Sequence, residues 1–164
     1  MKSIKLFLIY ICLLFPLTGV AQKKQLQTVR DQIKSGKELT KAENTLRGLL
    51  VDSASKKNNK IWLLLCDVLT KQYEQGNEKL YLKQKYDTAA LFTVTRKLYD
   101  VMSRFDSLDA QPDAKGRVRA KYRAKHADFL NSIRPNLFNG GSYFIHKKDY
   151  NTAFDYYSDY LLSA

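Results

Sequence analysis

The stretch that decides the fold is Leu137–Ala164, LFNGGSYFIHKKDYNTAFDYYSDYLLSA. Leu137, Gly141 and Phe144 are spaced so that they share one face of a helix. After the polar residues 146–149 the same spacing returns, and the inner face of this second helix would hold Ala153, Tyr157, Tyr160 and Leu161. The sequence therefore predicts two helices joined by a tight turn.

Small residues on these two predicted helices would let their backbones approach closely. We expect Gly141 to face Ala153, with Phe144, Tyr150 and Tyr157 filling the space around that contact. This arrangement of bulky, small and aromatic residues resembles a tetratricopeptide (TPR) repeat. Two positions depart from the family pattern, since Leu and Tyr stand at 137 and 160, where Trp and Ala are usual.

The resemblance to TPR proteins implies both a fold and a class of function. It implies an all-α chain whose helical hairpins stack as a right-handed α-α superhelix of about seven helices. It also implies a scaffold that binds a protein or peptide partner in a groove lined by the first helix of each repeat. Carried over residue by residue, the partner-binding side chains would be Asn139, Ser142 and Tyr143.

The predicted domain spans residues 22–164, with its clearest repeat at 134–164, a weaker repeat at 23–56 and an irregular middle at 58–132. Earlier helices are predicted over residues 25–33, 40–51, 60–74, 86–105 and 114–132. We expect Gly76 and Asn77 to end the third of these helices, and Pro135 to fix the bend before the last hairpin.

The first 21 residues have the order of a secretory signal peptide. Lys2 and Lys5 precede a nearly apolar run at residues 6–17, and Gly19-Val20-Ala21 offers a cleavage site after Ala21. The alternative is a membrane anchor, but spanning a bilayer takes about 20 apolar residues. We therefore expect an exported protein without a membrane span after cleavage, in the periplasm or cell envelope of a Gram-negative bacterium.

Charge suggests a second mode of binding. The 164-residue chain has a formal net charge of +12, and Lys115 begins a basic stretch that continues with Arg117, Arg119, Lys121, Arg123 and Lys125. In a helix these side chains would surround Val118 and Tyr122 as a solvated face. The alternative is a site for an acidic polymer such as lipopolysaccharide, an acidic glycan or nucleic acid.

Catalytic and metal-binding patterns are not found in the sequence. Cys66 lies in an apolar run, which predicts a buried and inert thiol, and with only this cysteine after the leader no intramolecular disulfide is expected. Neither His126 nor His146 belongs to an HExxH motif or another ligand cluster. We therefore expect a binding protein that has no enzymatic activity, cofactor or metal.

The last helix carries more apolar residues than one helix contact can cover, namely Phe154, Tyr157, Tyr160, Leu161 and Leu162. We expect either that the natural chain continues past Ala164 with further repeats or that this C-terminal face mediates self-association. Asp155 and Tyr156 are predicted to point away from the Ala153 face, where they could meet a ligand.

Overall fold

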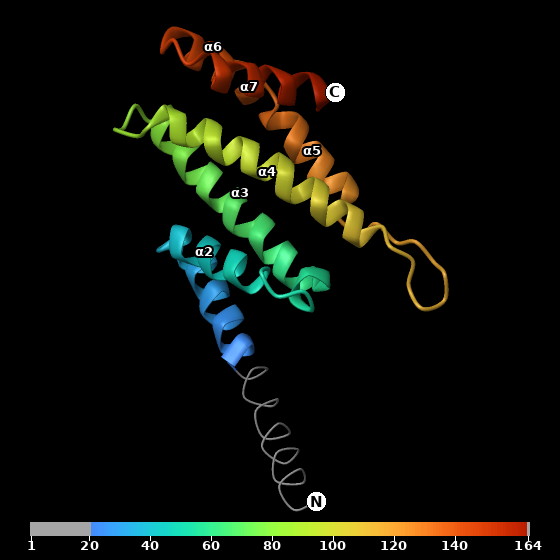
Figure 1. Ribbon diagram of the computed structural model, residues 1–164. Helices are drawn as coiled ribbons and strands as arrows, with labels where there is room; N and C mark the ends of the chain where they lie inside the picture. Colours follow the sequence, from blue (N-terminus) through green and yellow to red (C-terminus); the bar gives the residue numbers. More distant parts are fainter. Residues whose placement is uncertain (1–20, 164) are drawn as a thin grey trace, which may run out of the picture.

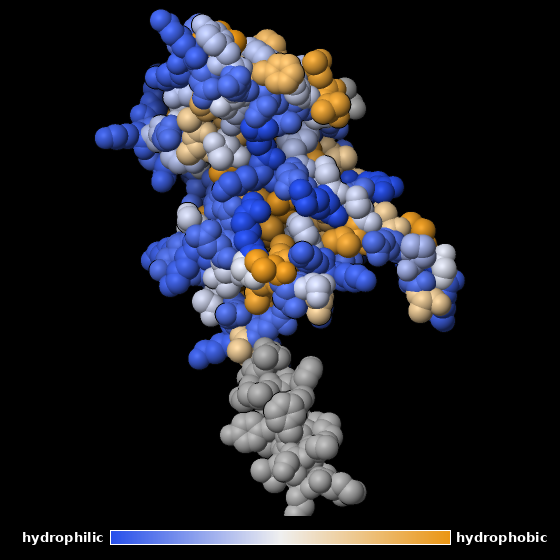
Figure 2. Space-filling model, in the orientation of Figure 1, coloured by the Kyte–Doolittle hydropathy of each residue, from blue (hydrophilic) through white to orange (hydrophobic). Residues whose placement is uncertain are grey.

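A computed structural model describes residues 21–163 of the chain, and this part is all-helical with no strand. The predicted signal peptide lies almost entirely on residues 1–20, outside the described residues. The all-α fold class predicted from the sequence is confirmed. The surface in view is mainly hydrophilic, with hydrophobic side chains exposed in places (Figure 2).

Residues 21–35 are helical, and a short 3-10 helix at Ser55–Lys57 lies in the connection between the second and third helices. The other α-helices are α2 (Leu39–Leu49), α3 (Asn59–Tyr81), α4 (Thr88–Asp109), α5 (Arg123–Ile133), α6 (Pro135–His146) and α7 (Tyr150–Leu162). In Figure 1 these elements succeed one another along one direction, from the blue N-terminal helix to the red C-terminal pair.

Consecutive helices make most of the packing contacts. The two long helices α3 and α4 form a hairpin, α2 packs on α3, and α6 packs on α4 and pairs with α7. A large apolar core joins residues 21–35 with α2, α3, α4 and the end of α5. A smaller core joins the second hairpin to α4 through Phe92, Leu137 and Tyr156.

The predicted end of the third helix at Gly76 is wrong, because α3 continues to Tyr81. Gly76 is buried inside the helix, and a Cβ atom at this position would lie 2.6 Å from the hydroxyl oxygen of Tyr86. The glycine therefore admits the Tyr86 ring and does not stop the helix. The short connection that follows ends at Asp87, whose carboxylate caps α4 by accepting from the Ala89 amide at 3.0 Å.

The helix predicted over residues 114–132 begins only at Arg123, and α4 extends to Asp109. Residues 110–122 between them contain no helix. The Asp113 carboxylate accepts from the backbone amides of Lys115 and Arg117, and Gly116 has a φ of 72°. This side-chain capture of backbone donors competes with a helix and holds the segment as a turn.

The last hairpin forms as predicted, with a different register at its interface. Leu137, Gly141 and Ala153 are buried, but Gly141 lies against the ring of Tyr157 and not against Ala153. Its neighbour Gly140 lies against Tyr156.

Two aromatic residues of α7 exchange the roles predicted for them. Tyr156, predicted to point outward, is only 2% exposed and stacks on Phe144 with ring centroids 5.4 Å apart. Tyr150, predicted to pack inside, is 63% exposed. The cause is a rotation of α7 that turns Tyr156 toward Phe92 of α4, with their ring centroids 6.4 Å apart.

Cys66 lies in the large core with 1% of its surface exposed. Burial raises the pKa of the thiol to about 12, and the charge of Asp67 acts in the same direction. A thiol in this setting stays protonated at neutral pH and is a poor nucleophile.

The close contact at Gly140 gives a stability prediction. Gly140→Ala should lower the free energy of unfolding by about 1–3 kcal/mol, because the added Cβ would lie 2.6 Å from the buried Tyr156 ring. The matched control is Gly48→Ala in α2, where a Cβ has no heavy atom within 4 Å. The control should raise the free energy of unfolding by roughly 0.5–1 kcal/mol. Equal effects in urea denaturation would contradict this account of the hairpin.

Candidate functional site

An open groove of about 660 Å³ lies between α2, α3 and α4, near the ends of these helices that meet the Gly36 turn and the α3–α4 connection. Its volume is in the range of small-molecule and peptide side-chain sites. Buried Leu39 and Val94 contribute apolar surface. Amides and charges surround them, contributed by Glu43, Gln72, Gln75, Lys79, Asp87 and Lys97.

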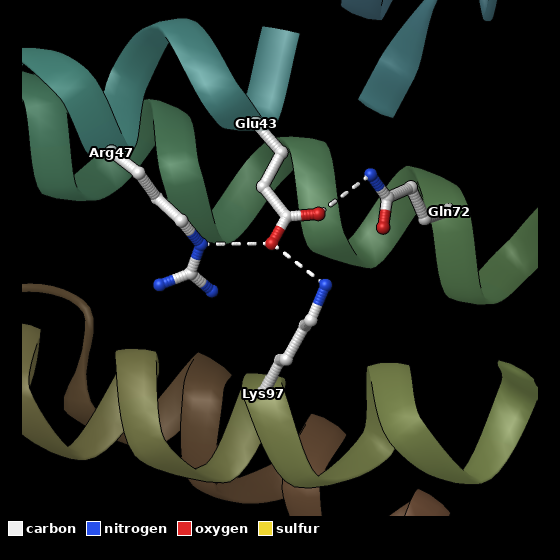
Figure 3. A network of polar contacts seen from close by, with 4 residues as sticks. All are labelled: Glu43, Arg47, Gln72 and Lys97. Carbon is white, nitrogen blue, oxygen red and sulfur yellow. Dashed lines mark hydrogen bonds and ion pairs between the residues drawn. The ribbon is translucent and has the colours of Figure 1, made fainter. Parts of the chain in front are cut away.

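Glu43 is the centre of the polar network in this groove (Figure 3). Its carboxylate comes from α2 and accepts from Lys97 Nζ of α4 at 2.9 Å, Arg47 Nε at 2.8 Å and Gln72 Nε2 of α3 at 3.1 Å. The residue is 3% exposed, so its charge is taken out of water and compensated by these donors. One side chain thereby connects three helices.

The pKa of the Glu43 carboxyl group shows that the hydrogen bonds of this network outweigh the cost of burying its charge. Burial by itself raises the pKa of the carboxyl group, but the hydrogen bonds from Lys97, Arg47 and Gln72 outweigh it and hold the pKa below its usual value. The carboxylate therefore stays ionised at neutral pH. Lys97 and Arg47 remain partly exposed, and of these two cations only Lys97 lines the groove.

The entrance of the groove is fixed by the turn before α2. Gly36 has a φ of 68°, a conformation that glycine adopts at little cost, and its carbonyl oxygen accepts from Gln75 Nε2 at 2.9 Å. Glu38 accepts from the Gln32 side chain at 3.0 Å. These bonds attach the turn to α3 and to the first helical segment.

A second groove of about 710 Å³ adjoins the first at Lys97 and runs between α2, α4 and α7. Arg96 of α4 forms ion pairs here with Asp155 and Asp159 of α7, and its guanidinium lies 4.9 Å from the centre of the Tyr156 ring. The ion pair between Glu43 and Lys97 and the pairs of Arg96 thus connect α4 to its neighbours on both sides.

The three predicted partner-binding residues are not brought together in an open groove. Asn139 is exposed on α6, whereas Ser142 and Tyr143 are partly buried. The Ser142 hydroxyl is 3.1 Å from the Tyr157 hydroxyl, and the Tyr143 ring lies against Phe92 at 5.7 Å. Ser142 and Tyr143 therefore help to hold α6 in place.

The predicted basic helix over residues 115–125 forms only from Arg123 onward, and its charges are only partly available. Both carboxylate oxygens of Asp113 accept hydrogen bonds from Arg117. Both carboxylate oxygens of Asp106 likewise accept hydrogen bonds from the Arg123 guanidinium. Lys121 lies over the Tyr122 ring, and Arg119 and Lys125 are exposed. An acidic polymer would meet a segment in which Arg117 and Arg123 already have carboxylate partners, which weakens this alternative.

His126 secures the start of α5 against α4. Its ring stacks on Tyr122 at 5.9 Å and lies 5.6 Å from Phe105. Among the described residues, its Nδ1 is a buried side-chain nitrogen without a hydrogen-bond partner. Burial lowers the pKa of His126, and Lys125 adds to this effect, while Asp109 and Asp106 oppose it.

Neither a metal centre nor a membrane-crossing helix is found in residues 21–163. No three His, Cys, Asp or Glu side chains in this part of the chain are grouped as metal ligands. No helix in it is both long and apolar enough to cross a bilayer.

The residues that build the groove are not among those predicted from the sequence. A local signal for Glu43 exists, because a carboxylate next to Ala42 and three residues before Leu46 lies at the border of an apolar helix face. Such a position indicates a buried charge that needs a cation. Nothing local identifies Lys97, which is 54 residues away in the chain.

Removal of the Glu43 carboxylate should destabilise the protein. Glu43→Ala should lower the free energy of unfolding by about 2 kcal/mol or more, because it leaves three donors without their acceptor. Glu74→Ala is the control, since Glu74 is exposed on α3 and its ion pair with Lys71 is 3.5 Å long. It should cost below about 1 kcal/mol. Equal losses in chemical denaturation would mean that Glu43 is not the centre of the network.

A pH dependence should follow from His126. Its folded-state pKa lies below the ordinary value of 6.5, so the unfolded chain takes up the proton first as the pH falls. The stabilisation that comes from burying a neutral His126 is complete above pH 6.5 and is lost progressively as the pH falls below 6.5. Between pH 7 and 5 the unfolding free energy of the wild type should therefore fall more steeply than that of His126→Gln. Parallel curves would contradict the buried neutral histidine.

Comparisons with known proteins give no relative from which a function could be transferred. A scan against protein-family models found no match, and searches of curated proteins and of solved structures also found none.

Proposed function

We propose that this protein is an exported TPR-like scaffold that binds a segment of a protein or peptide partner in the groove between α2, α3 and α4. The observation that carries the proposal is the composition of that groove, in which an apolar floor is surrounded by side-chain amides and charges. Sites that bind ligands are commonly concave and apolar with a few placed polar groups.

The order of contacts supports a repeat architecture. Two successive hairpins, α3/α4 and α6/α7, contain a glycine in the first helix against a tyrosine ring, Gly76 against Tyr86 and Gly140 against Tyr156. Since α6 packs on α4, the second hairpin is placed on the first. In this proposal the hairpins belong to a right-handed TPR-like superhelix, and α5 is an inserted helix between two repeats.

The chemistry of the groove favours a peptide over a highly charged ligand. Gln72 and Gln75 carry amide groups that can donate and accept, as a peptide backbone does. The acidic residues Glu38, Glu43 and Asp87 and the basic residues Lys79 and Lys97 nearly balance in charge. A polar segment with an apolar side chain for the floor is the occupant that we propose.

Export is supported by the first 21 residues, where a basic start, an apolar run and small residues precede Gln22. The partner in this proposal is therefore a protein or peptide of the periplasm or cell envelope.

The groove can be tested with a displayed library of random linear peptides. Selected peptides should lose at least about tenfold in affinity for Thr93→Trp, because Thr93 lines the groove and is exposed on α4. Thr28→Trp is the matched control, since both threonines are exposed on helices and donate to the carbonyl four residues earlier. The control should bind as the wild type does.

Equal binding by both variants would contradict the groove as the site. Affinity should also change little between low and high salt. A steep loss with salt would instead indicate the acidic-polymer mode predicted as the alternative.

A further inference from the structure

The outer side of α7 carries an exposed apolar stripe made of Tyr150, Phe154, Tyr157 and Leu161. Phe154 is 71% exposed and Leu161 is 72% exposed, whereas Tyr157 is partly buried. Their spacing places all four on one helix face. Figure 2 shows hydrophobic side chains at the surface over the α6/α7 end of the molecule.

Helix α6 enlarges this apolar surface. Phe138 is 50% exposed, and Ile145, seven residues later on the same helix face, is also exposed. The Phe138 ring lies 5.4 Å from Tyr157 and 5.7 Å from Tyr160 in edge-to-face contacts. The exposed sides of α6 and α7 therefore adjoin in one surface.

The inner contacts of the hairpin use the other side of α7. Ala153 and Tyr156 are buried, and Tyr156 lies between Phe144, Phe92 and the Arg96 guanidinium. Within the described residues, the α7 stripe is thus left without a partner of comparable size.

We propose that the α7 stripe is a dimer interface occupied by the same stripe of a second copy of this chain. The stripe has spacings of four, three and four residues, which read the same in both directions along the helix. An antiparallel α7 of a second copy would therefore bring Tyr150 opposite Leu161 and Phe154 opposite Tyr157. Such self-complementarity is what a twofold interface requires.

The size and charge of the surface fit this occupant. Four side chains of this surface are half exposed or more, namely Phe138, Tyr150, Phe154 and Leu161. Together they present on the order of 500 Å² of largely apolar area, a large part of the roughly 800 Å² per partner of a standard interface. No charged residue belongs to the stripe. The nearest carboxylates, Asp155 and Asp159, are paired with Arg96 on the side that faces α4, so they do not oppose each other across the contact.

Sedimentation velocity over a range of protein concentrations tests the dimer. The wild type should pass from monomer to dimer as concentration rises, and Phe154→Glu should weaken the association by at least about tenfold. Val51→Glu is the control, because Val51 is 77% exposed and far along the chain from α7. It should dimerise as the wild type does.

A wild type that stays monomeric at millimolar concentration would overturn the proposal and assign the face to a helix of another protein. Association that Phe154→Glu leaves unchanged, or that Val51→Glu weakens equally, would also overturn it.

Disulfide cross-linking tests the antiparallel geometry in a Cys12→Ser background, where the buried Cys66 does not interfere. A mixture of Tyr150→Cys and Leu161→Cys chains should cross-link rapidly, because these positions face each other across the interface between the two antiparallel α7 helices. Each variant alone should cross-link slowly, since two identical positions lie at opposite ends of the contact. The reverse result would exclude the antiparallel pairing.

Discussion

Both hairpins depend on the contact of a glycine in their first helix with a tyrosine ring that follows in the chain, from the α3–α4 connection in one hairpin and from α7 in the other. Gly76 receives Tyr86, and Gly140 receives Tyr156, with no room for a Cβ atom in either place. A glycine inside a helix costs about 1 kcal/mol relative to alanine. Burial of the tyrosine ring stabilises the fold by more than this cost. An aromatic side chain buries about 150–250 Å², and its contacts with other rings add further stabilisation. The glycines are therefore sites of helix approach, in positions where helix propensity alone disfavours them.

This contact also determines the groove. Because Gly76 lies inside α3 and does not end it, the helix continues far enough to bring Lys79 beside Tyr86, with the ammonium 5.8 Å from the ring centre. Gln72 and Gln75, which precede Gly76 on the same helix, line the groove beside Lys79. Glu43 then closes the arrangement, because a buried carboxylate with donors from its own helix, α3 and α4 allows few other positions of α2.

The sequence predicts the fold class and the last hairpin because these depend on local periodicity, which a single chain displays directly. It fails at Gly76 and at residues 114–122, where local signals have two meanings. A glycine ends a helix or admits a neighbour, and a basic run forms a helix unless an Asx turn such as that of Asp113 captures its amides. The rotation of α7 that buries Tyr156 depends on Phe92, which no local pattern connects to it.

The groove residues show even more clearly that local sequence patterns do not reveal long-range contacts. Glu43 and Lys97 are each ordinary helix residues in sequence, and only the packing of α2 against the α3/α4 hairpin makes them a pair. Partner-binding residues were predicted on α6 by carrying a repeat pattern over position by position. In the structure, two of these three side chains stabilise the hairpin, since α6 lies over α4 and its polar residues meet Tyr157 and Phe92. A repeat pattern therefore locates helices better than it locates binding side chains.

The groove and the α7 stripe lie at different places along the stack of helices, and this separation has a physical consequence. The groove is framed by α2, α3 and α4, whereas the stripe belongs to the C-terminal pair at the far end (Figure 1). A second copy on α7 would leave the groove open, so that a dimer would present two grooves to one partner. Arg96 pairs with Asp155 and Asp159 beside Lys97, so α7 is attached to the helix that forms one groove wall. A dimer that holds α7 in place would thereby also restrict α4, and binding at both grooves would gain from their fixed distance in the way that linked sites do.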